Sequence, residues 1–159
     1  MRAVLFLVAA FLIAGPCFAG EVAYRPGGAS FADAWHRFYD LGDHEPELDD
    51  PLIRRGPAMV PAICEAVAHK DMKYRRYALS ALGYLRDPAA IPCLERILRD
   101  EGELDYFRGD ALEAIYRIDQ PLGERYVAEY GDQGGYLRLV ADLISQGAVP
   151  VGESGLEHE

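Results

Sequence analysis

Apolar side chains recur between residues 56 and 131 with the three- and four-residue spacing of helices, in two kinds of segment that alternate. The first kind has prolines at or near its first turn, where a missing N–H costs nothing. The second kind places small residues where helices must approach closely. The stripes are Val60, Ile63 and Val67, then Ile91, Leu94 and Leu98 for the first kind, and Tyr74, Ala78, Leu82 and Leu85, then Phe107, Ala111, Ile115 and Ile118 for the second. Both kinds are predicted to be helices.

The two kinds of segment form a repeat. Residues 78–85 (ALSALGYL) match residues 111–118 (ALEAIYRI) at a spacing of 33, and the proline-led residues 57–63 match residues 88–94 at a spacing of 31. A period in the low thirties with two helical patterns is typical of a helical solenoid. Neither helix can bury its stripe alone, and stacking consecutive pairs solves that problem.

The predicted fold is therefore all-α, a layered right-handed α-solenoid of about three helical pairs with an N-terminal capping helix. The repeat domain spans residues 56–146, and its third pair consists of residues 121–130 and the weakly patterned residues 136–146. Residues 20–55 are predicted to be a linker with capping helices. Residues 147–159 are predicted to be a disordered acidic tail.

Two short elements are expected in the N-terminal segment. Phe31, Ala34, Trp35 and Phe38 share one face of a helix, so the single Trp is expected to seal the first repeat. Asp50 and Pro51 are expected to start a short helix to Arg55. The acidic loop around His44 that joins them could hold a divalent cation, because clustered oxygens suit Ca²⁺, but a solvated linker is the simpler interpretation.

At these residues the chain resembles HEAT repeats, most closely the short bacterial type that also occurs in phycobilin lyase subunits. The matching positions are Pro61, Tyr74, Arg75 and residues 78–83 in one unit, and Pro92, Asp100, Phe107, Arg108 and residues 111–115 in the next. The resemblance implies a binding scaffold with a ladder of turn aspartates and arginines. Asp100 fits the family's turn aspartate but His69 takes that place in the first unit, which weakens the expected ladder there.

The first 19 residues have the three parts of a secretory signal peptide. Arg2 gives a positive charge, residues 3–14 are apolar without interruption, and Gly15 and Pro16 precede a cleavage site after Ala19. An uncleaved anchor and a lipoprotein attached at Cys17 are the alternatives. The sequence thus predicts a periplasmic or secreted protein with no membrane attachment after cleavage.

Charge and length limit the function classes. The 159 residues include 16 Lys and Arg against 26 Asp and Glu, for a net charge of −10. Since an acidic protein repels phosphate at long range, a nucleic-acid partner is not expected. The length is that of one compact domain.

Cys64 and Cys93 are the two cysteines that remain after signal cleavage, 29 residues apart. Their spacing contains no CxxC pair, which excludes a thioredoxin-type motif and a cysteine zinc site. Free cysteines on helices usually behave as small buried apolar side chains. In an oxidising compartment a disulfide is the alternative, provided that the two Cα atoms come within about 7 Å.

No catalytic motif is apparent in the sequence, so no enzyme activity, metal or cofactor is predicted. The second helices of a solenoid line its concave side, and side chains off their apolar stripes form the natural binding face. Tyr and Arg are favoured at such surfaces. The candidate binding residues are Arg76, Tyr77, Ser80, Tyr84, Tyr106, Asp110, Glu113 and Arg117. The predicted function is an exported scaffold that binds another protein or a peptide; an accessory lyase-like protein or small-ligand carrier is the alternative.

Overall fold

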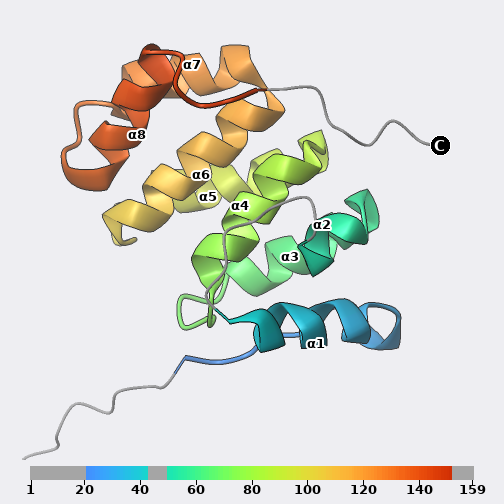
Figure 1. Ribbon diagram of the computed structural model, residues 1–159. Coiled ribbons are helices and arrows are strands. Elements are labelled where there is room, and N and C mark those ends of the chain that lie inside the picture. Colours follow the sequence, from blue (N-terminus) through green and yellow to red (C-terminus); the bar gives the residue numbers. More distant parts are fainter. Residues whose placement is uncertain (1–20, 43–49, 152–159) are drawn as a thin grey trace, which may run out of the picture.

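The computed structural model describes residues 21–42 and 50–151, and in these ranges the chain forms eight α-helices and three short 3₁₀ helices (Figure 1). The prediction of an all-α protein is confirmed. The elements are η1 (Gly28–Phe31), α1 (Ala32–Leu41), α2 (Pro51–Arg54), η2 (Pro57–Met59), α3 (Val60–Val67), α4 (Arg75–Leu85), η3 (Pro88–Ala90), α5 (Ile91–Arg99), α6 (Asp105–Ile118), α7 (Gln120–Tyr130) and α8 (Gly135–Ser145). None of these helices is both long and apolar enough to cross a membrane.

The prolines start helices as the sequence predicts. Pro57 and Pro88 begin η2 and η3, and each of these 3₁₀ turns runs directly into an α-helix with a second proline, Pro61 or Pro92, in its first turn. These positions need no N–H donor, so the rings cost the helices nothing. The Asp87 side chain caps η3 by accepting a hydrogen bond from the Ala89 N–H at 2.9 Å.

The helices α4, α6 and α8 form one continuous layer, called here the second-helix layer. The most extensive helix–helix contacts are between α4 and α6 and between α6 and α8. Helix α3 packs against α4, α5 against α6, and α7 against both α6 and α8. Figure 1 shows the elements following one another through the molecule, from α1 at the bottom to α7 and α8 at the top.

Two glycines permit the close approach of neighbouring second helices. A Cβ atom on Gly83 of α4 would lie 3.0 Å from the Ala114 Cα of α6, and one on Gly109 of α6 would lie 2.6 Å from the Tyr136 Cδ1 of α8. Real Cβ atoms essentially never show a contact as short as that at Gly109, and the contact at Gly83 would be tighter than nine in ten real ones. Small residues in the second kind of helix therefore set the spacing of the layer.

Two buried arginines at equivalent repeat positions connect each pair of helices to the next. The Arg75 Nε–H donates to the Val67 carbonyl of its own pair at 2.7 Å, and its Nη1 donates to the Glu103 carboxylate of the next turn at 2.8 Å. Arg108 repeats both contacts, with the Leu98 carbonyl at 2.8 Å and the Gln133 side-chain oxygen at 2.6 Å.

The expected ladder of turn aspartates is thus replaced by one in which glutamate and glutamine accept from the arginines. Asp100 instead accepts from the Lys70 Nζ of the preceding turn at 2.7 Å and from the Gly102 N–H at 2.9 Å. His69, which occupies the equivalent place in the first turn, stacks on Tyr24 with ring centroids 3.8 Å apart.

The N-terminal cap is held by long-range contacts. Trp35 is fully buried, and its Nε1–H donates to the Pro26 carbonyl at 2.8 Å. Val22 pairs with Met72 in an isolated parallel bridge, which ties the segment before α1 to the turn between α3 and α4. Trp35 is buried as its apolar face predicts, and the predicted short helix after Asp50 is confirmed, since the buried Asp50 side chain caps α2.

A disulfide joins Cys64 of α3 to Cys93 of α5, with their Cα atoms 5.7 Å apart. Of the two alternatives that the sequence leaves open, the structure contains the bonded pair, so the interpretation as two free buried thiols is wrong. The bond crosses between consecutive first helices.

The packed part of the chain extends beyond residue 146, where the repeat domain was predicted to end. Val149 is 6% exposed and belongs to the core, and Val151 packs against that core. Residues 147–151 therefore contradict the prediction of a disordered tail that starts at residue 147. The predicted signal peptide, the acidic loop around His44 and residues 152–159 lie outside the described residues.

Candidate interaction surface

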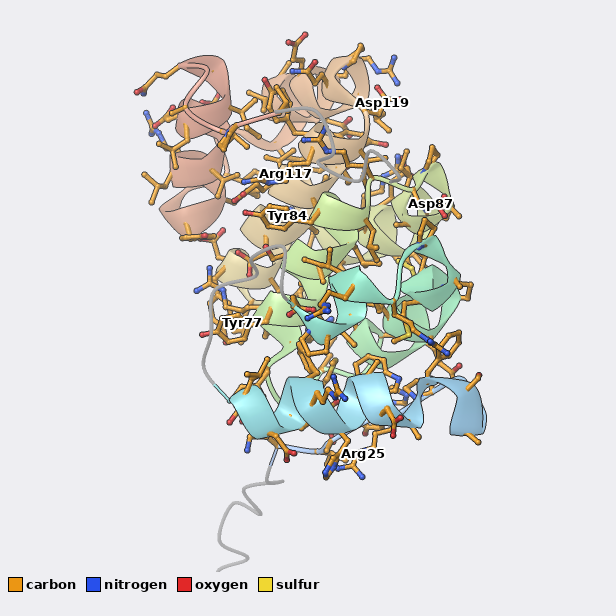
Figure 2. The ribbon with its side chains drawn as sticks, turned by 45° about the vertical axis from the view of Figure 1, so that its right-hand side comes forward. Arg25, Tyr77, Tyr84, Asp87, Arg117 and Asp119 are labelled. Atoms are coloured by element: carbon orange, nitrogen blue, oxygen red, sulfur yellow. A yellow bond between two sulfur atoms is a disulfide. The ribbon has the colours of Figure 1, made fainter. Side chains whose placement is uncertain are left out.

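The eight candidate residues lie on two neighbouring helices of the second-helix layer, four on α4 and four on α6. Arg76 and Tyr106 are exposed, Asp110 is buried, and the other five are half-buried. Figure 2 shows Tyr77, Tyr84 and Arg117 toward one side of the molecule, with Asp87 and Asp119, which cap η3 and α7, toward the other. Six of the eight candidates belong to two clusters of paired charges and aromatic rings, which are defined by their contacts.

The first cluster, called the Arg76 cluster, contains Arg76, Tyr106, Asp110 and Tyr136. The guanidinium of Arg76 makes two parallel hydrogen bonds to the Asp110 carboxylate at 2.7 and 2.8 Å, and its Nη2 also donates to the Tyr136 hydroxyl at 2.9 Å. The same guanidinium lies over the rings of Tyr106 and Tyr136, 5.5 and 4.9 Å from their centroids. One arginine on α4 therefore holds side chains of α6 and α8.

Burial and hydrogen bonds both shift the pKa values in this cluster. Burial raises the pKa of Asp110 above its ordinary value, although the Arg76 guanidinium acts in the opposite direction. The hydrogen bonds from Arg76 to Asp110 raise the pKa of Arg76 above its ordinary value. Burial also raises the pKa of the Tyr136 hydroxyl. Arg76 and Tyr136 consequently stay protonated at neutral pH, and both can donate hydrogen bonds.

Tyr136 is held from the other side by Asp105, the first residue of α6. The Asp105 carboxylate accepts hydrogen bonds from the backbone N–H groups of Tyr136 and, at 3.2 Å, Leu137. A carboxylate at this position accepts hydrogen bonds from N–H groups at the start of α8. It also interacts favourably with the positive end of the α8 dipole. Asp105 of α6 thus holds the first turn of α8, while Arg76 of α4 holds the Tyr136 side chain.

The second cluster, called the Arg117 cluster, contains Tyr84, Glu113 and Arg117. Arg117 donates to the Glu113 carboxylate from Nε at 3.0 Å and from Nη2 at 2.9 Å, and its guanidinium lies 4.7 Å from the centre of the Tyr84 ring. The remaining Nη1 donates to the backbone carbonyl of Pro150 at 2.9 Å. The second-helix layer is therefore contacted by the chain's own C-terminal segment at this point.

A small hollow lies between the two clusters. It has a volume of about 30 Å³ and is lined by Ser80, Asp110, Glu113, Ala114 and Arg117, so four of the eight candidates meet there. A space of this size accommodates a water molecule or two but no organic cofactor. The described residues also contain no group of three or more His, Cys, Asp or Glu side chains that could hold a metal ion.

The sequence reasoning missed exposed apolar side chains at the end of the layer. Leu139 and Leu143 of α8 are 51% and 37% exposed, one helical turn apart on the same face, and Leu104 before α6 is 54% exposed. It also missed Tyr136 as a member of the Arg76 cluster. For the two leucines the available signal was the 33-residue spacing, which leads from Tyr106 to Leu139 and from Asp110 to Leu143.

A cavity of about 570 Å³ lies between α1 and α2, away from the candidate residues. Its polar lining includes Asp33, Arg37, Asp40, Arg54 and Arg55. Residues 43–49, which join α1 to α2 in the sequence, lie outside the described residues. We therefore base no function on this cavity.

The protein is thus all-α, and the surface of its second-helix layer carries charged side chains that are paired with one another. No family model matches the sequence, and comparisons with curated proteins and with solved structures likewise gave no match. The functional interpretation therefore depends on the residues described above.

Proposed function

We propose that the chain is a short HEAT-like solenoid of about three helical pairs, exported from the cytoplasm, that binds another protein along its second-helix layer. The repeated contacts of Arg75 and Arg108 and the close packing at Gly83 and Gly109 support the repeat architecture. In a solenoid each unit contacts its neighbours, which is the pattern that α4, α6 and α8 follow.

The binding proposal rests chiefly on the rigidity of the outer face of this layer. Its charges are paired within the molecule, in the Arg76 and Arg117 clusters, so long side chains are already fixed before a partner arrives. Preorganisation of this kind lowers the entropic cost of binding. Tyr106, Leu139 and Leu143 remain exposed on the same layer and supply the apolar contact area that a protein partner needs.

Export is supported by the covalent link between Cys64 and Cys93. Disulfides of this kind form and persist in oxidising compartments, whereas cytosolic reductants keep thiols free. The proposed location is the periplasm or the extracellular medium.

On the predicted binding face, the small-ligand alternative is less well supported. Typical small-molecule sites have volumes of about 300 to 1,000 Å³, whereas the hollow on the predicted binding face measures about 30 Å³. A protein partner requires no deep cavity, because flat surfaces with a few aromatic and aliphatic anchors suffice. We therefore favour a protein-binding scaffold.

The proposal is tested by capture from an envelope extract with the immobilised, disulfide-bonded protein and quantitative mass spectrometry. A Tyr106→Ser/Leu139→Ser variant is compared with a matched Glu65→Ser/Arg125→Ser variant, whose residues are exposed on the first helices α3 and α7. We expect one or a few proteins to be lost with the first variant and retained with the second. Equal capture by both variants, or no specific capture by the wild type, would contradict the proposal.

A further inference from the structure

The segment after α8 turns back onto the second-helix layer. Gly147 adopts a left-handed conformation with φ of 68°, and the Ala148 N–H donates to the Leu143 carbonyl at 2.9 Å, which ends the helix and reverses the chain. Figure 1 shows this segment, in dark red, crossing the top of the molecule after it leaves α8. It reaches Arg117 near the C-terminal end of α6.

Burial alternates along this non-helical segment. Ala148 is exposed, Val149 is buried, Pro150 is exposed and Val151 is half-buried against the core. Such alternation is what a peptide shows when it lies along a surface with every second side chain directed inward. The contact therefore selects aliphatic side chains two positions apart and leaves the residue between them free to vary.

Arg117 recognises the backbone of the same segment. Two of its nitrogens are held by Glu113, which orients the third toward the Pro150 carbonyl at 2.9 Å. The guanidinium lies over the Tyr84 ring, so both its plane and its direction are fixed. A backbone carbonyl is present at every position of every peptide, and a partner's segment could accept the same hydrogen bond.

We propose that the Arg117 cluster is a docking site for a non-helical segment of a partner protein, with aliphatic side chains at alternate positions, and that residues 148–151 occupy this site as a tethered ligand. This inference rests on the proposed function and concerns its regulation. The partner's segment must displace residues 148–151, so the free protein presents only the Arg76 half of its surface. The tethered contact consists of two valines and one charge-assisted hydrogen bond, which is small enough to open reversibly.

Tethering explains why so small a contact is occupied. A segment joined to α8 by a two-residue turn has a high effective concentration at the site, so weak intrinsic affinity suffices to keep it docked. The same affinity in a separate peptide gives partial binding only at millimolar concentrations. Removal of the tethered segment should therefore make the site accessible to an added peptide.

The test uses a variant that ends at Gly147, labelled with ¹⁵N, and an acetylated and amidated peptide with the sequence of residues 147–151. We expect saturable shifts of the Arg117 Nε–H signal and of the backbone amides of residues 113–118 in this variant. In the full-length protein the same titration should give an apparent affinity at least about tenfold lower, because residues 148–151 already fill the site.

Two substitutions make the outcome specific. Arg117→Gln in the shortened variant should weaken peptide binding by about tenfold or more, since a charge-assisted hydrogen bond is lost, whereas Arg138→Gln, at an exposed position of α8, should leave it unchanged. A peptide with Asp in place of Val149 should not bind. If the shortened variant fails to fold, the full-length Val149→Asp variant, whose segment is undocked by a buried charge, takes its place in the titration.

The inference is overturned if no folded variant binds the peptide, or if full-length and shortened proteins bind it equally. These results are distinguishable from failure of the proposed function. Loss of peptide binding with continued capture through Tyr106 and Leu139 refutes only the tethered-ligand inference. Peptide binding combined with capture that does not depend on these two residues refutes only the proposed interaction face.

Discussion

Substitution of the two junction arginines by leucine tests how the helical pairs are held together. Both guanidinium groups are buried and both donate to a carbonyl of their own pair. They differ in the acceptor on the next turn. Arg75 is paired with the Glu103 carboxylate, whose side chain is 3% exposed, whereas Arg108 is paired with the neutral amide of Gln133.

This difference sets the expected magnitudes. Arg75→Leu removes the closest cation from the buried Glu103 carboxylate, which keeps only the Lys70 Nζ at 4.0 Å and the Leu104 N–H at 3.0 Å; loss of one partner of a buried ion pair typically destabilises a protein by about 3–5 kcal/mol. Arg108→Leu leaves neutral groups without a donor, which typically costs about 1–3 kcal/mol. Each guanidinium also lies over an aromatic ring. Arg75 is 4.5 Å from the centroid of the Phe107 ring, whereas Arg108 is 6.0 Å from that of Tyr130, so Arg75→Leu loses the closer contact. We therefore expect Arg75→Leu to be the more destabilising by about 2 kcal/mol.

Urea unfolding of the oxidised protein, followed by far-ultraviolet circular dichroism, gives both free energies. The double variant Arg75→Leu/Glu103→Leu serves as the control, because removal of both members of a buried ion pair is often close to neutral. It should recover most of the stability that Arg75→Leu loses. Equal effects of the two arginine substitutions, or no recovery in the double variant, would refute the reasoning.

Three further predictions concern the disulfide, the helix spacing and alkaline pH. Replacement of both Cys64 and Cys93 by Ala should lower the free energy of unfolding by about 3.5 kcal/mol, because the bond closes a loop with a separation of 29 residues; urea curves under oxidising conditions measure this. Gly83→Ala should destabilise by about 1–3 kcal/mol in the same assay, since its Cβ would meet the α6 backbone, and a neutral result would contradict the predicted close packing. Burial raises the pKa of Tyr39 from 10.0 to about 12, so its neutral hydroxyl contributes stability that is complete below pH 10 and is lost as the pH rises toward 12. Tyr39→Phe should remove this part of the alkaline destabilisation. It should also remove one late step from the tyrosinate absorbance titration, and an unchanged titration would contradict the raised pKa of Tyr39.

The local elements of the fold were predictable from the sequence because their signals are local. Pro57, Pro61, Pro88 and Pro92 mark helix starts, and the helices begin where these residues predict. Trp35 is buried as its apolar face indicates. In each case the deciding interactions lie within one turn of helix.

Contacts between distant segments could not be predicted in the same way. The pairing of Val22 with Met72 uses backbone groups, which have no sequence signature. The choice between a disulfide and two free thiols depended on whether α3 and α5 bring the Cys64 and Cys93 Cα atoms to 5.7 Å, a distance set by helix packing. The predicted tail failed for a related reason, because Val149 is buried by a surface that forms only after α6 and α8 have packed.

The helices that carry the candidate residues could be predicted, but the pairing of their charges could not. Arg76, Asp110, Glu113 and Arg117 do lie on α4 and α6, yet their charges are already paired with one another. A repeat pattern assigns residues to one face of a helix, whereas the pairing depends on the offset between neighbouring helices. The residues left exposed for a partner, Leu139 among them, therefore emerge only from the packed structure.

Site-specific photo-crosslinking in the native envelope tests the central claim most directly. A photoreactive amino acid is placed at Tyr106 or Leu139 of the second-helix layer, and at Glu65 or Arg125 of the first helices as controls. The account predicts a discrete crosslinked species of the same mass and identity from the first two positions and none from the controls. A crosslink that forms mainly from Glu65 or Arg125 would contradict it.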